Sequence, residues 1–337
     1  MNPLELVKIG ETGVSVTRLG IGGVFVAGRE HGDGTPAGDY ANAIATVERA
    51  YELGIRYFDT APFYGRGRSE VRYGRALRSF ARETFVLSSK VGRLLIPDPD
   101  EPGEWPDDGI VKMTARFDMS RDGILRALEE SLSRHQLGHV DIVYLHDPDW
   151  EDLEDEAIAT ALPTLVELRE RGVIKAIGVG MNQWEMPARF MERFHLDIVL
   201  LAGRYTLLDQ SAFNHFLPLC EAEGTRIALG GPYNSGILAA QNLDGPVWFN
   251  YQQAAHEWID KAKALKRVCD DHQVDMRAAA LQFPLTHPAV ASVIPGAASP
   301  TQVEQNIALM KTPIPAALWD ALKAEALIPA DAPVPVE

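Results

Sequence analysis

The sequence predicts a single (β/α)8 barrel, that is, a TIM barrel with extended βα loops, and three observations lead to this prediction. Short apolar runs rich in β-branched residues alternate eight times with amphipathic segments of helical length. Several of these runs are apolar throughout, as parallel strands covered on both faces are. The pattern Gly-X-Gly-X-X-Gly, which a doubly wound nucleotide-binding sheet would place after its first strand, occurs nowhere. We therefore expect residues 1–337 to form one barrel domain rather than a doubly wound sheet.

The expected elements can be placed in chain order. The strands are predicted at 19–21, 55–58, 85–89, 142–145, 177–179, 198–201, 227–229 and 293–294. The helices are predicted near 40–53, 69–79, 120–137, 156–171, 183–194, 214–223, 256–271 and 301–310, with an extra helical stretch at 276–287. The last helix has a clear start signal, because Ser299 can cap it, Pro300 suits its first position and Gln302 can complete a capping box.

Two segments are expected to be long βα loops, and a third to be irregular. Residues 94–117 are rich in Pro, Asp and Gly, and residues 232–255 carry several aromatic side chains. Such loops build the active-site face of a barrel, so both are candidate substrate walls. For 94–117, a disordered surface insertion is an equally good interpretation. The tail 329–337 contains three prolines and is expected to be irregular.

Composition and charge exclude several classes of protein. The chain has 32 Lys and Arg against 47 Asp and Glu, a net charge of −15, which argues against binding to nucleic acid or to an anionic membrane. Cys220 and Cys269 are its two cysteines and form no CxxC, which excludes a disulfide framework and a cysteine zinc site. No signal peptide and no apolar run of about 20 residues is visible. We expect a cytoplasmic enzyme that acts on a small molecule, as a monomer or homodimer.

Four polar residues stand at or just after predicted strand ends. Asp59 follows the second strand, Tyr64 lies on the loop behind it, Lys90 ends the third strand and His146 ends the fourth. Taken singly, each is more often a hydrogen-bonded loop residue or a packing residue. On consecutive strands of one barrel they would all reach the same mouth, where barrel enzymes carry out their chemistry. Together they predict a catalytic site.

The four side chains suit proton transfer between an alcohol and a carbonyl. A tyrosine has an ordinary pKa of about 10, which is high for an acid or base at neutral pH. A neighbouring ammonium would lower this pKa, and a buried carboxylate would hold the ammonium in place. A neutral imidazole could orient the substrate oxygen. The hydride must come from, or go to, another molecule.

These residues lie in segments that resemble the aldo-keto reductase superfamily. The matching segments are Gly-Ile-Arg-Tyr-Phe-Asp-Thr-Ala-Pro-Phe-Tyr-Gly at 54–65, Leu-Ser-Ser-Lys-Val-Gly at 87–92, Asp-Ile-Val-Tyr-Leu-His at 141–146, residues 172–179 and Ile-Pro-Gly at 294–296. The similarity extends from about residue 8 to about residue 327. It implies a (β/α)8 barrel with a nicotinamide cofactor across its mouth. By this resemblance Asp59, Tyr64, Lys90 and His146 form the catalytic tetrad, with Tyr64 as acid or base.

The cofactor pattern of the family departs at several positions here. After the fifth strand the usual Gly-Val-Ser-Asn is replaced by Gly-Val-Gly-Met-Asn, so Asn182 is the expected amide ligand from a shifted position. The glutamine common on the sixth strand is Ala202. The aromatic residue that stacks on nicotinamide is replaced within Gly-Gly-Pro-Tyr at 230–233. Gly231, Pro232 and Tyr233 are therefore expected cofactor contacts, with Tyr233 a guess for the stacking partner.

Residues 230–238 and 145–149 resemble the bacterial aldose dehydrogenase branch, whose substrates include L-fucose, D-threo-aldoses and galactose. The resemblance implies oxidation of an aldose at its anomeric hydroxyl to the lactone, with Tyr64 as general base. Pyridoxal 4-dehydrogenases share the branch, so oxidation of pyridoxal to 4-pyridoxolactone is the alternative. A nicotinamide-binding regulatory protein without turnover is a second alternative. A metal-dependent hydrolase using His146, Asp147 and Asp149 is disfavoured, because the remaining histidines fall mostly in predicted helices or their flanks, and no metal is expected.

The sequence after the eighth strand favours NAD over NADP. Family members that use NADP carry Lys or Arg after the Ile-Pro of this strand and an Arg about six positions later, and these cations pair with the 2′-phosphate. Here the two positions are Gly296 and Gln302, and no Lys or Arg occurs between Ala289 and Met310. A 2′-hydroxyl could hydrogen-bond Ser299 or Gln302. The remaining expected contacts, for adenine, are Gln305 and Asn306. A cation from a distant loop is the alternative.

Overall fold

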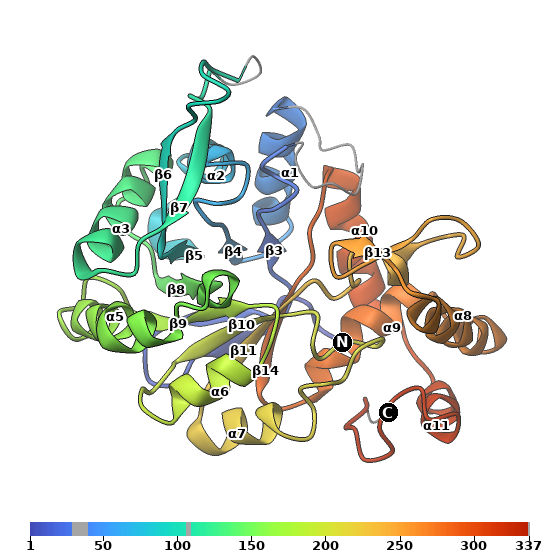
Figure 1. The fold of residues 1–337 in the computed structure, drawn as a ribbon. Helices are drawn as coiled ribbons and strands as arrows, with labels where there is room; N and C mark the ends of the chain where they lie inside the picture. The colour runs from blue at the N-terminus through green and yellow to red at the C-terminus, as the bar shows by residue number, and fades with distance from the viewer. Residues whose placement is uncertain (29–39, 106–108, 336–337) are drawn as a thin grey trace.

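A computed structural model describes residues 1–28, 40–105 and 109–335. Eight parallel strands lie in the order β14-β11-β10-β9-β8-β5-β4-β3 (Figure 1). They are β3 (Ile21–Gly22), β4 (Tyr57–Asp59), β5 (Val86–Val91), β8 (Ile142–His146), β9 (Ala176–Met181), β10 (Ile198–Ala202), β11 (Arg226–Gly230) and β14 (Val290–Ile294). Parallel bridges between Leu19 and Val293 and between Gly22 and Gly296 join the two edges of the sheet. The predicted (β/α)8 barrel is confirmed.

The helices alternate with these strands and surround the barrel (Figure 1). They are α1 (Tyr40–Glu52), α2 (Arg68–Leu77), α3 (Arg121–His135), α4 (Glu154–Glu156), α5 (Leu162–Glu170), α6 (Glu185–Met191), α7 (Phe216–Glu223), α8 (His256–Asp271), α9 (Met276–Gln282), α10 (Pro300–Lys311) and α11 (Ala316–Ala324). The expected helix at 156–171 begins with a π-helical turn, Ala157–Ala161, before α5. The expected stretch at 276–287 ends earlier, at Gln282, because Pro284 has no amide hydrogen to continue the helix.

Two sets of buried side chains follow from the twofold alternation of the strands. Residues of one parity point into the barrel, where Tyr57, Tyr144, Ile198 and their neighbours form the inner cluster. Residues of the other parity pack against the helices in a much larger outer cluster. The inner cluster also contains Val16 of the antiparallel hairpin formed by β1 (Leu6–Lys8) and β2 (Ser15–Thr17). The interior is filled, so function is confined to the mouth.

Segment 94–117 differs from the expected loop. Most of it belongs to an antiparallel hairpin of β6 (Arg93–Pro97) and β7 (Met113–Phe117), which projects from the barrel beside α2 (Figure 1). The Pro, Asp and Gly residues that suggested a loop are concentrated at 98–109, while the run Met-Thr-Ala-Arg-Phe at 113–117 alternates as a strand does. Trp105 packs against α2, where the Arg68 guanidinium lies 4.6 Å from its ring centre. The other predicted loop, 232–255, contains the short hairpin β12 (Trp248–Phe249) and β13 (Gln252–Gln253).

Candidate active site

The four residues of the predicted tetrad meet at the carboxyl ends of three neighbouring strands. Asp59 is the last residue of β4, Lys90 the penultimate residue of β5, and His146 the last residue of β8. All three side chains are buried, and Tyr64 is half-buried on the loop between β4 and α2. Because β4, β5 and β8 are adjacent in the sheet, their carboxyl ends bring these groups to one side of the mouth.

Lys90 is fixed by three hydrogen bonds. Its Nζ donates to Asp59 Oδ2 at 2.8 Å, to Asp59 Oδ1 at 3.0 Å and to the carbonyl of Thr60 at 2.9 Å. Ser88 Oγ donates to the same carboxylate at 2.7 Å. An ammonium has three donors, so no donor of Lys90 is left for the Tyr64 hydroxyl in this arrangement. Lys90 instead lies 4.6 Å from the centre of the Tyr64 ring and acts on it through its charge.

The direction of the Tyr64 pKa differs from the sequence expectation. The pKa of Tyr64 is raised well above its usual value of 10.0, first by burial and then by the negative charge of Asp59. Arg93 opposes this shift. Because burial is the largest cause, the ammonium of Lys90 does not produce the net lowering that we expected. The neutral phenol is the favoured form of Tyr64 in this state of the protein.

His146 meets Tyr64 edge to face, with ring centres 5.8 Å apart. Its pKa is lowered well below the usual value by burial, and also by Arg93 and Lys90, so the imidazole is neutral at physiological pH. His146 Nε2 lies 3.4 Å from Asp147 Oδ2. His146 Nδ1 is buried without a hydrogen-bond partner among the described residues. The neutral imidazole thus has one ring nitrogen that no described protein group satisfies.

A buried ion pair between Arg93 and Asp147 lies beside the tetrad and was not predicted from the sequence. Arg93 Nη2 donates to Asp147 Oδ2 at 2.8 Å, and the guanidinium lies 4.2 Å from the ring centre of Phe63 and 4.4 Å from that of Trp150. Burial raises the pKa of Asp147 to about 7, against the opposing charge of Arg93. The signal available in the sequence was the arginine three residues after the strand-ending lysine. A polar residue at that position comes from the β6–β7 hairpin, which the sequence did not predict.

The predicted cofactor residues lie along the ends of β9, β11 and β14. Asn182 follows β9 directly, and Gly231, Pro232 and Tyr233 follow β11. The Tyr233 hydroxyl donates to Asn306 Oδ1 of α10 at 2.8 Å, so two predicted contacts are joined. Asn234, the next residue, was not predicted. Its amide donates to Gly203, and its buried Oδ1 has no partner among the described residues. An unsatisfied acceptor between β10 and β11 fits a ligand with N–H or O–H donors, such as a nicotinamide cofactor.

The remaining predicted contacts lie at the amino end of α10. Ser299 Oγ accepts from the amide of Gln302 at 3.3 Å, and Gln302 Oε1 accepts from the amide of Ala298 at 2.7 Å, so this capping box is confirmed with a shift of one residue. Gln305 is exposed on the same helix. At Gly296 a side chain would collide with Phe25, because an added Cβ would lie 2.1 Å from its ring. The ring of Phe25 thus covers the position after the strand-eight Ile-Pro.

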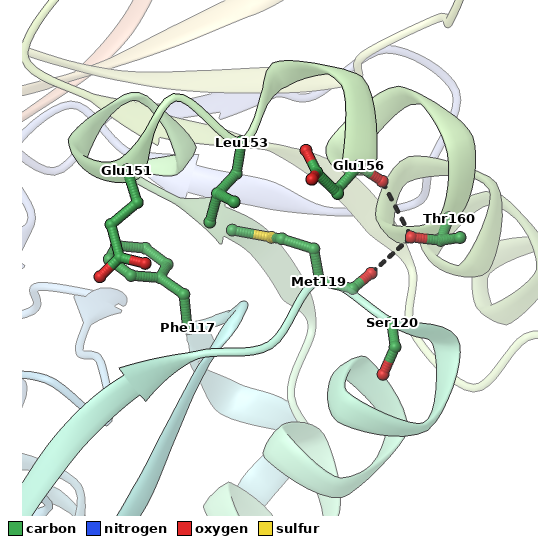
Figure 2. Close-up of a pocket in the computed structure, with 7 residues that line it drawn as sticks. All are labelled: Phe117, Met119, Ser120, Glu151, Leu153, Glu156 and Thr160. Atoms are coloured by element: carbon green, nitrogen blue, oxygen red, sulfur yellow. Dashed lines mark hydrogen bonds between the residues drawn. The ribbon is translucent and has the colours of Figure 1, made fainter.

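A separate cavity of about 300 Å³ lies outside the tetrad. It is lined by Phe117, Met119, Ser120, Glu151, Leu153, Glu156 and Thr160 (Figure 2). Thr160 Oγ1 closes one side by donating to the carbonyl oxygens of Met119 and Glu156 (Figure 2). Its two acidic side chains are Glu151 and Glu156, and no tetrad residue is among those that line it.

In the described part of the chain, no three His, Cys, Asp or Glu side chains are grouped to hold a metal ion. Cys220 and Cys269 are buried free thiols whose pKa values are raised by burial, the latter to about 12. No helix within the described ranges is long and apolar enough to cross a membrane.

Comparison with known proteins agrees with the barrel fold. The chain is 40% identical over 296 residues to a D-threo-aldose 1-dehydrogenase from a Pseudomonas species, a match that covers 85% of this chain and 88% of that enzyme. It is 38% identical to the pyridoxal 4-dehydrogenase of Microbacterium luteolum, covering 95% and 97%. Among solved structures, the holo form of an aldo-keto reductase from Bacillus halodurans superposes with a TM-score of 0.74 at 25% identity, covering 98% of both chains.

The family assignment follows from the extent of these matches. The sequence model of the aldo/keto reductase family matches residues 18–326, which include every barrel strand and all four tetrad positions. Members of this family are oxidoreductases that act on small molecules with a nicotinamide cofactor. The barrel fold is accounted for on this basis. The chain belongs to the aldo/keto reductase family.

Proposed function

We propose that this protein oxidises an aldose at C1 to the corresponding lactone with NAD. The arrangement of Tyr64 between Lys90 and His146 is the observation that carries the proposal. The ring of Tyr64 has a fixed ammonium 4.6 Å from its centre and a neutral imidazole at its edge. A pyranose would present its anomeric hydroxyl to the Tyr64 oxygen, which as phenolate accepts the proton. His146 Nδ1 would hold the same substrate oxygen.

The balance of the reaction is simple. The O–H bond of the anomeric hydroxyl breaks, its proton goes to Tyr64, and a C1–O double bond forms as C1 loses hydride. When bound, a nicotinamide cofactor supplies the hydride acceptor. Asp59 holds the Lys90 ammonium in place, so the developing phenol and lactone lie next to one fixed ion pair. The relative named D-threo-aldose 1-dehydrogenase supports this direction and substrate class.

The choice of NAD rests on the charges around the expected adenosine site. Phe25 covers Gly296, and Gln302 is neutral. Arg277 is the cation whose charge acts on Tyr233, beside Asn306. Arg277 is bound by Asp275 through contacts of 2.6 to 3.2 Å, which cancel its charge locally. A 2′-phosphate would thus meet no free positive charge at Gly296, Gln302 or Arg277, whereas a 2′-hydroxyl needs none.

Oxidation of pyridoxal is the second candidate, because the relative named pyridoxal 4-dehydrogenase matches nearly the whole chain. Its cyclic hemiacetal would present the same kind of hydroxyl to Tyr64. A regulatory role without turnover is less well supported, since all four tetrad groups are present and in contact.

A single screen tests these proposals. Formation of reduced cofactor is measured with free aldoses, pyridoxal and simple alcohols, each with NAD and with NADP. We expect the highest kcat/KM for an aldose with NAD. A higher kcat/KM for reduction of simple aldehydes would contradict aldose oxidation, and an equal or higher value with NADP would contradict the cofactor assignment. Tight cofactor binding without turnover of any substrate would favour the regulatory role.

A further inference from the structure

We propose that Tyr251 is a specificity-determining residue, whose phenol hydrogen-bonds a hydroxyl group of the substrate other than the one that reacts. The inference rests on the proposed function and narrows it to polyhydroxylated substrates. Tyr251 lies on the β12–β13 turn, 187 residues after Tyr64 in the chain, and belongs to none of the motifs discussed above. Three features of the turn support this role: its backbone conformation, the contacts that anchor it, and the exposure of its tyrosine.

The backbone of this turn is unusual for its residues. The pairs Trp248–Gln253 and Phe249–Gln252 leave Asn250 and Tyr251 as a two-residue loop. Both have positive φ angles, 55° and 64°. Two-residue hairpin loops of this kind favour Asn followed by Gly, and asparagine tolerates the left-handed region well. A bulky tyrosine at the second position costs conformational energy, so its presence there calls for a role that glycine lacks.

The turn is also tied to the barrel. Arg204, two residues after β10, donates from Nη2 to Asn250 Oδ1 at 2.7 Å. The amide of Tyr251 donates to Ser235 Oγ at 3.2 Å. At the base of the hairpin, the ring centres of Phe249 and Trp258 are 4.3 Å apart. These contacts hold the turn against the loops that follow β10 and β11, at the end of the barrel where the tetrad lies.

The phenol of Tyr251 is the exposed part of this anchored turn. The residue is 66% exposed, so the ring that carries its hydroxyl is not packed into the protein. The charges of Asp147 and Lys90 act on this hydroxyl, and its own charge would act on Tyr64. An exposed ring on a turn anchored at the mouth is available to a ligand rather than committed to packing.

This arrangement favours a substrate with several hydroxyl groups. While the reacting hydroxyl is on Tyr64, a second hydroxyl can exchange hydrogen bonds with Tyr251, since a phenol both donates and accepts. The carboxylate of Asp147 can accept from another. The exposed face of the Tyr251 ring suits the apolar C–H face of a sugar. A simple aldehyde or alcohol would gain none of these contacts.

The test compares Tyr251→Phe with the unchanged protein on the best aldose from the screen and on its 2-, 3- and 4-deoxy analogues. Loss of one neutral hydrogen bond corresponds to roughly a 3- to 10-fold rise in KM for the parent aldose, with little change in kcat. For the one analogue that lacks the contacted hydroxyl, the two proteins should have equal KM values. Tyr51→Phe is the matched control, because the Tyr51 hydroxyl bonds Thr84 on the outside of the barrel at 2.7 Å.

The KM values of the two proteins decide whether Tyr251 contacts a substrate hydroxyl. An unchanged KM for the parent aldose, or the same rise for the parent and for every analogue, would overturn the role of Tyr251 and leave aldose oxidation standing. If the unchanged protein oxidises no aldose, the proposed function is wrong and this inference fails with it. Binding of NADH, followed by its fluorescence, should be equal in the two proteins, and a loss of binding in Tyr251→Phe would mean that Tyr251 serves the cofactor instead.

Discussion

Lys90 donates two hydrogen bonds to the carboxylate of Asp59, at 2.8 and 3.0 Å, and both side chains are buried. The third donor of Lys90 is used by the carbonyl of Thr60. The ammonium is therefore a fixed charge that touches the ring of Tyr64 and cannot swing to donate to its hydroxyl without leaving a partner. This relationship makes the site rigid, and the first two predictions follow from it.

Tyr64→Phe should abolish most of the turnover and leave cofactor binding intact. The Tyr64 phenolate is the proton acceptor in the proposed oxidation, and general acid–base catalysis contributes roughly 100- to 10,000-fold. The loss should appear in kcat, measured with the best substrate of the screen, while the Kd for NADH changes little. Near-normal turnover would show that another group accepts the proton.

Lys90→Met should destabilise the fold as well as inactivate the enzyme. Removal of one partner of a buried ion pair leaves the other charge uncompensated, at a cost of about 3–5 kcal/mol. The free energy of unfolding, measured by urea titration, should recover partly in the double variant Asp59→Asn/Lys90→Met. Lys112→Met is the control, because Lys112 pairs with Glu101 at the surface and its loss should cost less than about 1 kcal/mol.

The oxidation rate should increase with pH. The pKa of Tyr64 is raised well above 10.0, and the reaction needs the deprotonated form, so the active fraction grows as pH rises. His146 has a lowered pKa, so it stays neutral and adds no inflection above neutral pH. We expect kcat/KM for oxidation to rise about tenfold per pH unit between pH 6 and 8. A plateau that begins below pH 8 would contradict this assignment.

Asp147 should make the stability of the protein depend on pH. Its pKa is about 7 in the folded protein, against about 3.9 when unfolded, so the folded state holds the proton more tightly. The contribution of Asp147 to the free energy of unfolding should be greatest below about pH 4, fall as pH rises toward 7, and stay level above pH 7. The free energy of unfolding of Asp147→Asn, minus that of the unchanged protein, should therefore be higher at pH 8 than at pH 4, by on the order of 1–4 kcal/mol.

The groups that face Asp147 provide the check on that prediction. Arg93 opposes the raised pKa, and Asp149 and Lys90 contribute smaller effects of opposite sign. Arg93→Leu should raise the pKa of Asp147 further, which carbon-detected NMR titration of the carboxyl group can measure. An unchanged or lowered pKa in this variant would show that Arg93 does not hold the carboxylate charged.

The sequence by itself determined the barrel and the place of the four predicted tetrad residues at its mouth. Eight apolar runs alternate with amphipathic segments, and a pattern of that length has few ways to bury both faces of its strands. The tetrad positions were visible because Asp59 and His146 terminate strands and Lys90 lies one residue before a strand end. In a parallel barrel, the end of a strand fixes the location of a side chain without any knowledge of packing.

Only the tertiary structure decided how the remaining groups meet. Arg204 anchors the turn of Tyr251 through Asn250, 46 residues further along the chain, and Arg93 reaches Asp147 from a hairpin that looked like a loop. The direction of the Tyr64 pKa likewise depends on the balance between burial, Asp59 and nearby cations. Such effects depend on distances between segments far apart in sequence and on the exclusion of water. Local hydrophobic patterns carry neither kind of information.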